Sequence, residues 1–200
     1  VFVFSILPLL AGSAHAALDK TVTSRERRLE VLLLYLFALG VAANGMSGAF
    51  GHLFLSDFVA ESIGWPVGSP FQLEVGFANL TIGVLGIVAV GRRDGFREAT
   101  VIAVAVFGVG ATIVHVIDIV ATGNLAPGNT IQNASNLIRP ALLIGILSAS
   151  RRAERRPDSE AGSRRFQEWR TTRIQAAWQI VMGVSAGFGV GFALEQTVIG

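Results

Sequence analysis

The sequence contains no cysteine and a single lysine. The lack of cysteine excludes disulfide bonds, thiolate metal sites and iron–sulfur clusters. The one lysine, Lys20, lies in a polar stretch, so an intramembrane Schiff base to a retinal-type cofactor is excluded as well. Charge is also scarce, because 15% of the residues are charged, against roughly 25% in soluble domains.

Apolar residues fill the chain instead. They make up 52% of the sequence, and the mean hydropathy is +0.57. Such a composition is typical of a helical membrane protein, in which each transmembrane helix needs about 20 apolar residues. We therefore predict an all-α fold, a single domain of residues 1–200 built as a bundle of six transmembrane helices. The predicted spans are about 1–18, 29–55, 72–91, 98–122, 134–150 and 174–196.

The basic residues predict how the bundle lies in the membrane. All but one of the 16 Lys and Arg residues fall in the stretches 20–28, 92–97 and 151–173, whereas loops 56–71 and 123–132 contain none. Short cytoplasmic loops keep Lys and Arg, and exported loops lose them. The prediction is a bacterial inner-membrane protein with both termini outside and the long basic loop 151–173 in the cytoplasm. A nucleic-acid partner is not expected, because the formal net charge is only +2.

Residues 1–16 have a second interpretation. Their apolar run ends in Ala14-His15-Ala16, which resembles the cleavage site of a secretory signal peptide. Cleavage there would leave Lys20 and the arginines after it outside, and would reverse the charge rule for the rest of the chain. We therefore expect the first helix to be retained.

The one basic residue outside these stretches, Arg139, belongs to a group of polar residues inside the apolar segments. Each ionisable group there costs on the order of 3 kcal/mol to insert and so needs an explanation. At about 1.5 Å per residue, the group lies within about 11 Å of the outer helix ends. The inner half holds almost nothing polar beyond Tyr35 and Gln179, which argues against an open pore. The candidate site residues are His52, Glu74, Asn79, His115, Asp118 and Arg139.

Three interpretations of this group remain open. In the first, it is a structural network in which Arg139 pairs with Asp118 or Glu74, and no ligand is needed. In the second, His52, His115 and Asp118 bind a metal ion, because nitrogen and oxygen ligands without cysteine suit Zn, Fe or Cu. Haem is disfavoured, because the two histidines differ in depth by about 6 Å.

In the third interpretation the group binds a proton or a small ligand. A His–Asp pair suits proton exchange. An arginine side chain suits an anionic or carbonyl oxygen, such as those of lipid headgroups and quinones. The residues that would form this site are His115, Asp118, Arg139, Glu74 and Asn79.

The sequence patterns of common enzyme classes are missing. The chain has no phosphate loop, dinucleotide fingerprint, nucleophile elbow or zincin helix, so an enzyme is not expected. The first hypothesis is a membrane protein with an outward-facing polar site for a small ligand, a metal ion or a proton. The alternative is a non-catalytic accessory subunit of a larger membrane complex. That subunit would contact its partners through the close-packing face of Gly183, Gly187 and Gly191.

Three segments carry a resemblance to a known group of proteins. The segment 69–80 (SPFQLEVGFANL), the helical stretch ending at His115 and the loop 123–129 together resemble small, uncharacterised, multi-pass bacterial membrane proteins. The resemblance extends over residues 40–150 or so. It implies a helical inner-membrane protein without an established activity. It also implies that four polar residues belong together as one feature of that family: Gln72, Glu74, Asn79 and His115.

Overall fold

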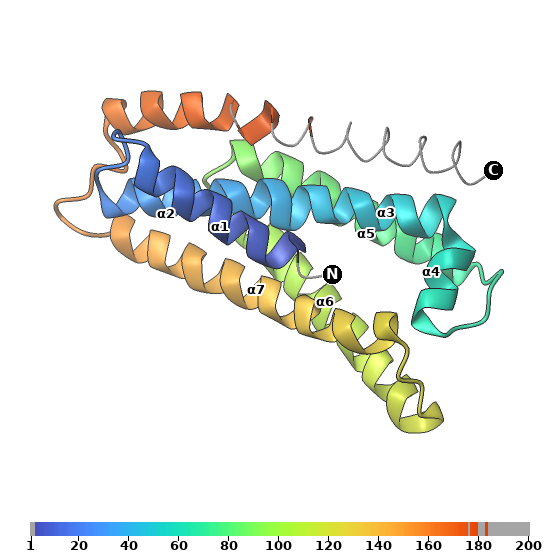
Figure 1. Ribbon diagram of the computed structural model, residues 1–200. Coiled ribbons are helices and arrows are strands. Elements are labelled where there is room, and N and C mark those ends of the chain that lie inside the picture. Colours follow the sequence, from blue (N-terminus) through green and yellow to red (C-terminus); the bar gives the residue numbers. More distant parts are fainter. Residues whose placement is uncertain (1–2, 176, 180–182, 184–200) are drawn as a thin grey trace.

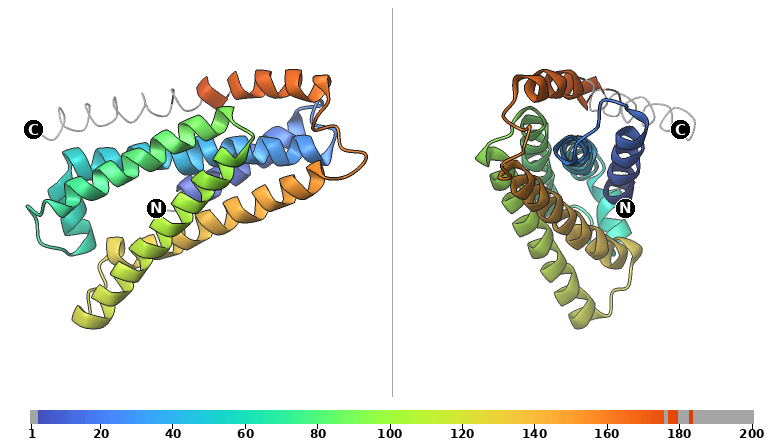
Figure 2. Two further views of the ribbon diagram at one scale, coloured as in Figure 1. Left: turned by 180° about the vertical axis from the view of Figure 1, so that it is seen from behind. Right: turned by 90° about the vertical axis from the view of Figure 1, so that its left-hand side faces the viewer.

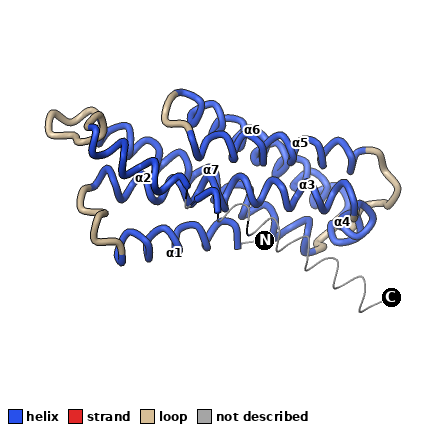
Figure 3. Tube along the Cα trace, turned by 90° about the horizontal axis from the view of Figure 1, so that it is seen from above, coloured by secondary structure: helices blue, strands red, loops and turns tan. Residues whose placement is uncertain are grey.

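The computed structural model describes residues 3–175, 177–179 and 183, and every regular element within them is a helix (Figure 1). The predicted all-α fold is therefore confirmed. The long helices run back and forth along the molecule and are joined by short loops (Figure 3). They are α1 (Val3–Leu18), α2 (Arg25–Tyr35), η1 (Leu36–Ala43), α3 (Asn44–Phe54), α4 (Ser56–Ile63), α5 (Phe71–Gly91), α6 (Gly95–Thr122) and α7 (Pro127–Glu154), followed by a helix of residues 164–175.

Helices α2, η1 and α3 form one continuous helix through the middle of the bundle. Seen end-on in the right-hand view of Figure 2, α2 is surrounded by other helices. Ser24 sets its start, because the Ser24 side chain accepts a hydrogen bond from the Arg27 amide and satisfies one free N–H of the first turn. The middle segment η1 is π-helical, and all of its residues are buried and apolar or glycine. A helix enclosed on every side needs no polar face.

Glycines let this central helix approach α5 closely. A Cβ atom at Gly45 would lie 2.5 Å from the nitrogen of Gly83, and one at Gly86 would lie 2.6 Å from the nitrogen of Ala42. Since these distances are shorter than a van der Waals contact, the backbones of the two helices touch, as in small-residue helix pairs of membranes. Gly110 of α6 makes no such close approach, because a Cβ there would meet nothing within 4 Å.

Three helices are long and apolar enough to cross a membrane: Arg25–Phe54, Phe71–Gly91 and Gly95–Thr122. They correspond to the second, third and fourth predicted spans. Two of them, α5 and α6, expose large apolar side chains, including Phe77 and Val84 on α5 and Val106 and Ile117 on α6. An apolar surface of this extent is typical of contact with lipid rather than with water.

The other predicted spans are confirmed only in part. The first is a shorter apolar helix, α1. The fifth lies within α7, whose first half carries asparagine, glutamine and arginine side chains, and α7 is not among the helices that meet the length and hydropathy needed for crossing. The sixth, 174–196, lies mostly outside the described residues. Six spans and the orientation of the bundle therefore stay predictions.

Two predicted loops contain helices. The first half of the outer loop 56–71 forms α4. The basic loop 151–173 begins inside α7 and ends inside the helix of residues 164–175. Only residues 155–163 of it form a non-helical connection, and Ala161 within this connection is buried.

The helix of residues 164–175 is docked on the start of the central helix. Phe166 is fully buried in the small apolar cluster formed there. Just before the helix, Glu160 pairs with Arg27 at 2.8 Å and accepts a hydrogen bond from the Ser24 hydroxyl. Burial raises the pKa of the Glu160 carboxyl, but the Ser24 and Arg27 hydrogen bonds outweigh burial and hold it below its usual value.

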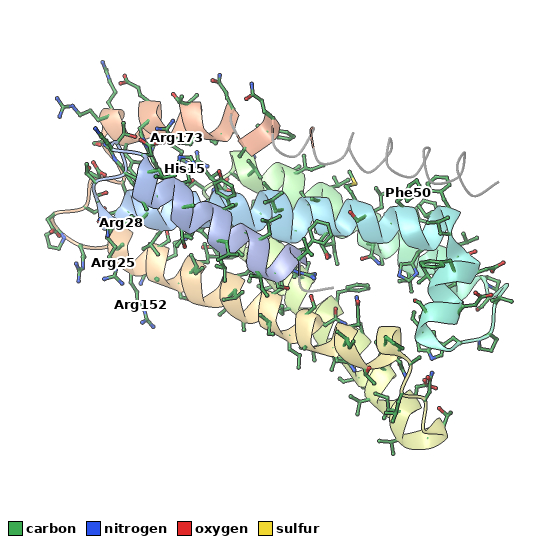
Figure 4. The ribbon with its side chains drawn as sticks, viewed as in Figure 1. His15, Arg25, Arg28, Phe50, Arg152 and Arg173 are labelled. Atoms are coloured by element: carbon green, nitrogen blue, oxygen red, sulfur yellow. The ribbon has the colours of Figure 1, made fainter. Side chains whose placement is uncertain are left out.

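The basic stretches gather at one end of the bundle. Figure 4 shows Arg25, Arg28 and Arg152 together at this end, with Phe50 near the other end. We call it the basic end; it includes the turn 19–24, the turn 92–94 and the connection 155–163. The partition of Lys and Arg along the sequence thus corresponds to a partition in space, which is the arrangement that the charge rule for membrane proteins describes.

Candidate functional site

Asp118 is the centre of a hydrogen-bond cluster at the end of the bundle opposite the basic end. Its Oδ2 accepts hydrogen bonds from Trp65 Nε1 at 3.0 Å, Asn124 Nδ2 at 2.9 Å and Asn129 Nδ2 at 2.8 Å. The donors come from the α4–α5 loop, the α6–α7 turn and the start of α7. A carboxylate with three neutral donors is well satisfied without a cation.

The α6–α7 turn positions these donors. Gly123 ends α6 with a φ of 72°, a left-handed conformation that side chains other than glycine rarely adopt. Helix α7 then starts at Pro127, whose fixed φ suits the first helical turn. The Asn124 side chain also donates to the carbonyl oxygen of Ile63 at 2.9 Å and so ties the turn to α4.

His115 lies beside this cluster and is 8% exposed. Its Nδ1 lies 2.7 Å from Asn129 Oδ1, and its ring stacks on Trp65 with centroids 5.3 Å apart. Since the Asn129 amide nitrogen donates to both Asp118 and the Asn124 carbonyl, Asn129 Oδ1 is the acceptor and His115 Nδ1 carries the proton. In the neutral ring, Nε2 then holds the lone pair.

The predicted site residues of α3 and α5 do not join these hydrogen bonds. His52 Nδ1 lies 2.7 Å from Gln72 Oε1. Asn79 donates to the carbonyl oxygen of Val75 one turn earlier, and Glu74 is exposed. Within the part of the chain that the structure describes, no three His, Asp or Glu side chains form a group that could hold a metal ion. The metal interpretation, which needs His52 beside the α6 residues, gains no support from this arrangement.

Arg139, in α7, is 8% exposed and forms no ion pair among the described residues. Its Nη2 donates to Ser135 Oγ at 2.9 Å, and Ser5 Oγ of α1 lies 3.1 Å from the same hydroxyl. Its Nε is buried without an acceptor. The predicted ion pair of Arg139 with Asp118 or Glu74 is therefore not found in the described part of the chain.

Two further polar atoms of α7 also lack partners in the described structure. Asn136 Nδ2 and Asn133 Oδ1 are buried, and neither has a hydrogen bond. Asn136 and Arg139 are three residues apart and so lie on one face of α7. Helix α6 approaches closely here, because a Cβ at Gly108 would lie 2.5 Å from the Asn136 carbonyl oxygen. Three buried polar atoms without partners on one helix are uncommon, since buried polar atoms are generally hydrogen-bonded.

A second cluster, at the basic end, surrounds Glu30 of α2, which is 1% exposed. Arg97 of α6 donates to its carboxylate from Nη1 at 2.9 Å and from Nη2 at 3.0 Å. Arg170 donates from Nε at 2.6 Å, and Arg93 Nε lies 3.9 Å away. The Arg97 guanidinium is buried over the ring of Phe37. One carboxylate thus joins α2, α6 and the helix of residues 164–175.

The sequence patterns do not predict this second cluster, because the basic stretches that contain Arg97 and Arg170 indicate only topology. A signal was present in the sequence. Glu30 lies on the same helical face as Leu33 and Phe37, a face that is otherwise apolar and buried. A carboxylate on such a face needs a buried cation, and the basic stretches supply the candidates.

The family of unknown function DUF6790 matches residues 1–156, which is most of the chain. The chain belongs to this family. The DUF6790 match includes α1 to α7, and so contains Asp118, Arg139, Glu30 and Arg97, whereas Arg170 lies beyond it. The expected resemblance to an uncharacterised family is confirmed, and the family brings no activity with it. No curated protein and no solved structure matches the chain.

Proposed function

We propose that this DUF6790 member is a multi-pass inner-membrane protein that binds a small ligand through an anionic or carbonyl oxygen at Arg139. The membrane part of the proposal is supported by three helices that are long and apolar enough to cross a bilayer. It is also supported by the gathering of the basic stretches at one end (Figure 4). By the charge rule, the basic end faces the cytoplasm.

The observation that carries the proposal is the buried guanidinium of Arg139, which has no carboxylate partner in the described structure. In the predicted fifth span, an arginine costs on the order of 3 kcal/mol to insert. The two acidic residues expected to offset this cost do not pair with Arg139: Asp118 accepts three neutral donors, and Glu74 is exposed. A bound anion or carbonyl group would supply the missing acceptor.

Two donor atoms that lack partners in the described structure, on the face of α7 that carries Arg139, indicate the class of ligand. Arg139 Nε and Asn136 Nδ2 are both donors. A carboxylate, a phosphate or a quinone-type carbonyl can accept from such donors, and a charged oxygen gains most from a guanidinium. A metal ion is disfavoured beside Arg139, because the guanidinium has no lone pair and repels a cation. The Ser5–Ser135 hydrogen bond joins α1 to α7 next to this position.

The ligand is expected to be recovered from the purified protein. Wild-type chain, purified from membranes in mild detergent and then denatured, should release about one equivalent of an acidic or carbonyl-bearing small molecule, measured by mass spectrometry of the extract. Arg139→Gln keeps a hydrogen-bond donor but removes the charge, so its extract should contain about tenfold less of that molecule.

Arg164→Gln is the matched control, since it makes the same change at an exposed arginine that has no ion pair in the described structure. It should retain the ligand. A wild-type extract without such a molecule, or equal amounts from wild type and Arg139→Gln, would contradict the proposal. Recovery of the chain in a stable larger assembly that Arg139→Gln disrupts, with no ligand extracted, would favour the accessory-subunit alternative.

A further inference from the structure

Three exposed arginines form a patch on the surface of the basic end. Arg25 and Arg28 lie in the first turns of α2, three residues apart and hence on one face, and Arg152 lies in the last turn of α7. Helices α2 and α7 pack against each other, and Figure 4 shows the three side chains on the same side of the molecule. All three are exposed, and none forms an ion pair among the described residues. We call them the arginine patch.

The carboxylates of the basic end do not neutralise the arginine patch. Most of them pair with other arginines: Asp19, Glu30, Asp94, Glu98, Glu154 and Glu160. Glu26, which follows Arg25 in the sequence, and Asp158, in the connection 155–163, form no ion pair in the described structure. The patch therefore keeps an excess of positive charge. Two of its cations also lie at the N-terminus of α2, where the helix dipole favours an anion rather than a cation.

The patch is placed at the level of lipid headgroups. It lies at the end of a bundle in which three of the described helices, the central helix among them, are long and apolar enough to cross a membrane. The helices that flank α2 expose apolar side chains along their length, including Leu7 and Leu10 on α1 and Ile138 and Ile144 on α7. Acyl chains can lie along these surfaces while the arginines meet the charged headgroup.

The geometry points to the arginine patch as a binding site for an anionic phospholipid, with its phosphate at Arg25, Arg28 and Arg152. Its acyl chains lie along the exposed apolar sides of α1 and α7. Arginine side chains recognise phosphate oxygens through paired hydrogen bonds. The inference does not depend on the ligand proposed for Arg139, which lies further along α7.

The test compares two lipids and two matched triple variants of the full chain. Detergent-solubilised protein is titrated with dioleoyl phosphatidylglycerol or with dioleoyl phosphatidylcholine, and lipid binding is followed by native mass spectrometry. Wild type should bind the anionic lipid about tenfold more tightly than the zwitterionic one, and the preference should fall with added salt. The Arg25→Gln, Arg28→Gln, Arg152→Gln variant should lose this preference.

The control variant carries Arg155→Gln, Arg164→Gln and Arg165→Gln, three exposed arginines that have no ion pair in the described structure. It has the same net charge as the patch variant and should keep the wild-type preference. A patch variant that keeps the preference, or a control that loses it equally, would overturn the inference. Inorganic phosphate that abolishes lipid binding at equal concentration would also overturn it, because the site would then be one for free phosphate.

Discussion

Replacing Glu30 with glutamine is expected to lower the free energy of unfolding by about 3–5 kcal/mol. The substitution keeps the shape of the side chain and removes the only carboxylate that Arg97 and Arg170 contact in the described structure. Arg97 is 1% exposed, so its charge would stay buried without compensation. Removing one partner of a buried ion pair is far more destabilising than removing a surface pair.

Thermal or denaturant unfolding of the purified protein in detergent measures this effect. Glu168→Gln is the matched control, because Glu168 is exposed on the helix of residues 164–175 and has no ion pair in the described structure. The control should change the free energy of unfolding by less than about 1 kcal/mol. If Glu30→Gln behaved like Glu168→Gln, the carboxylate would not hold the basic end together.

The second large effect is expected from Gly45→Val. The first added carbon would lie 2.5 Å from the nitrogen of Gly83 and 2.8 Å from the carbonyl oxygen of Asn79. Both neighbours are backbone atoms, so α3 and α5 would have to separate along their shared face. We expect a loss of about 3 kcal/mol or a failure to accumulate folded protein, because backbone cannot repack as side chains do.

Gly110→Val makes the same change on α6 at a position where a Cβ meets nothing within 4 Å. It should accumulate and unfold like the wild type, measured by membrane expression and thermal unfolding of both variants. Equal loss in the two variants would mean that valine is poorly tolerated in these helices generally. The contact between Gly45 and Gly83 would then not be the cause.

The sequence was informative where a long apolar run ends in charged residues. The predicted spans agree with the central helix, α5 and α6 within a few residues. The charged turns around Ser24 and Asp94 mark the starts of the central helix and of α6. Helix α7 was predicted too short at its beginning. Its first turn carries Asn129, which is buried and donates to Asp118 of α6 and to the carbonyl oxygen of Asn124 in the α6–α7 turn rather than facing lipid. Hydropathy cannot distinguish a polar residue buried in this way from one in a loop.

The polar clusters were harder to predict than the helices. The spacing of His115 and Asp118 places both on one face of α6, and the structure joins them through Asn129. Trp65 lies in a loop 53 residues before Asp118, and no sequence pattern indicates that it donates to Asp118 and stacks on His115. Arg97 lies 67 residues from Glu30, and no local pattern specifies which of many arginines reaches a given carboxylate.

The central claim, that a ligand neutralises Arg139, is tested most directly by the sign of the stability change in Arg139→Met. Methionine has a similar length and no charge. Replacing a buried charge that has no partner by an apolar side chain removes a desolvation cost and stabilises a protein. If a ligand is bound to Arg139, the same replacement removes the ligand's stabilisation as well.

Thermal unfolding of the two proteins, purified in parallel from membranes in mild detergent, gives this sign. Our account predicts that Arg139→Met unfolds at a lower temperature than the wild type. It also predicts that the difference disappears or reverses after the ligand is stripped from the wild type by extended detergent washing. An Arg139→Met protein that is more stable than the unwashed wild type would contradict the account, because Arg139 would then be a buried charge that no ligand neutralises.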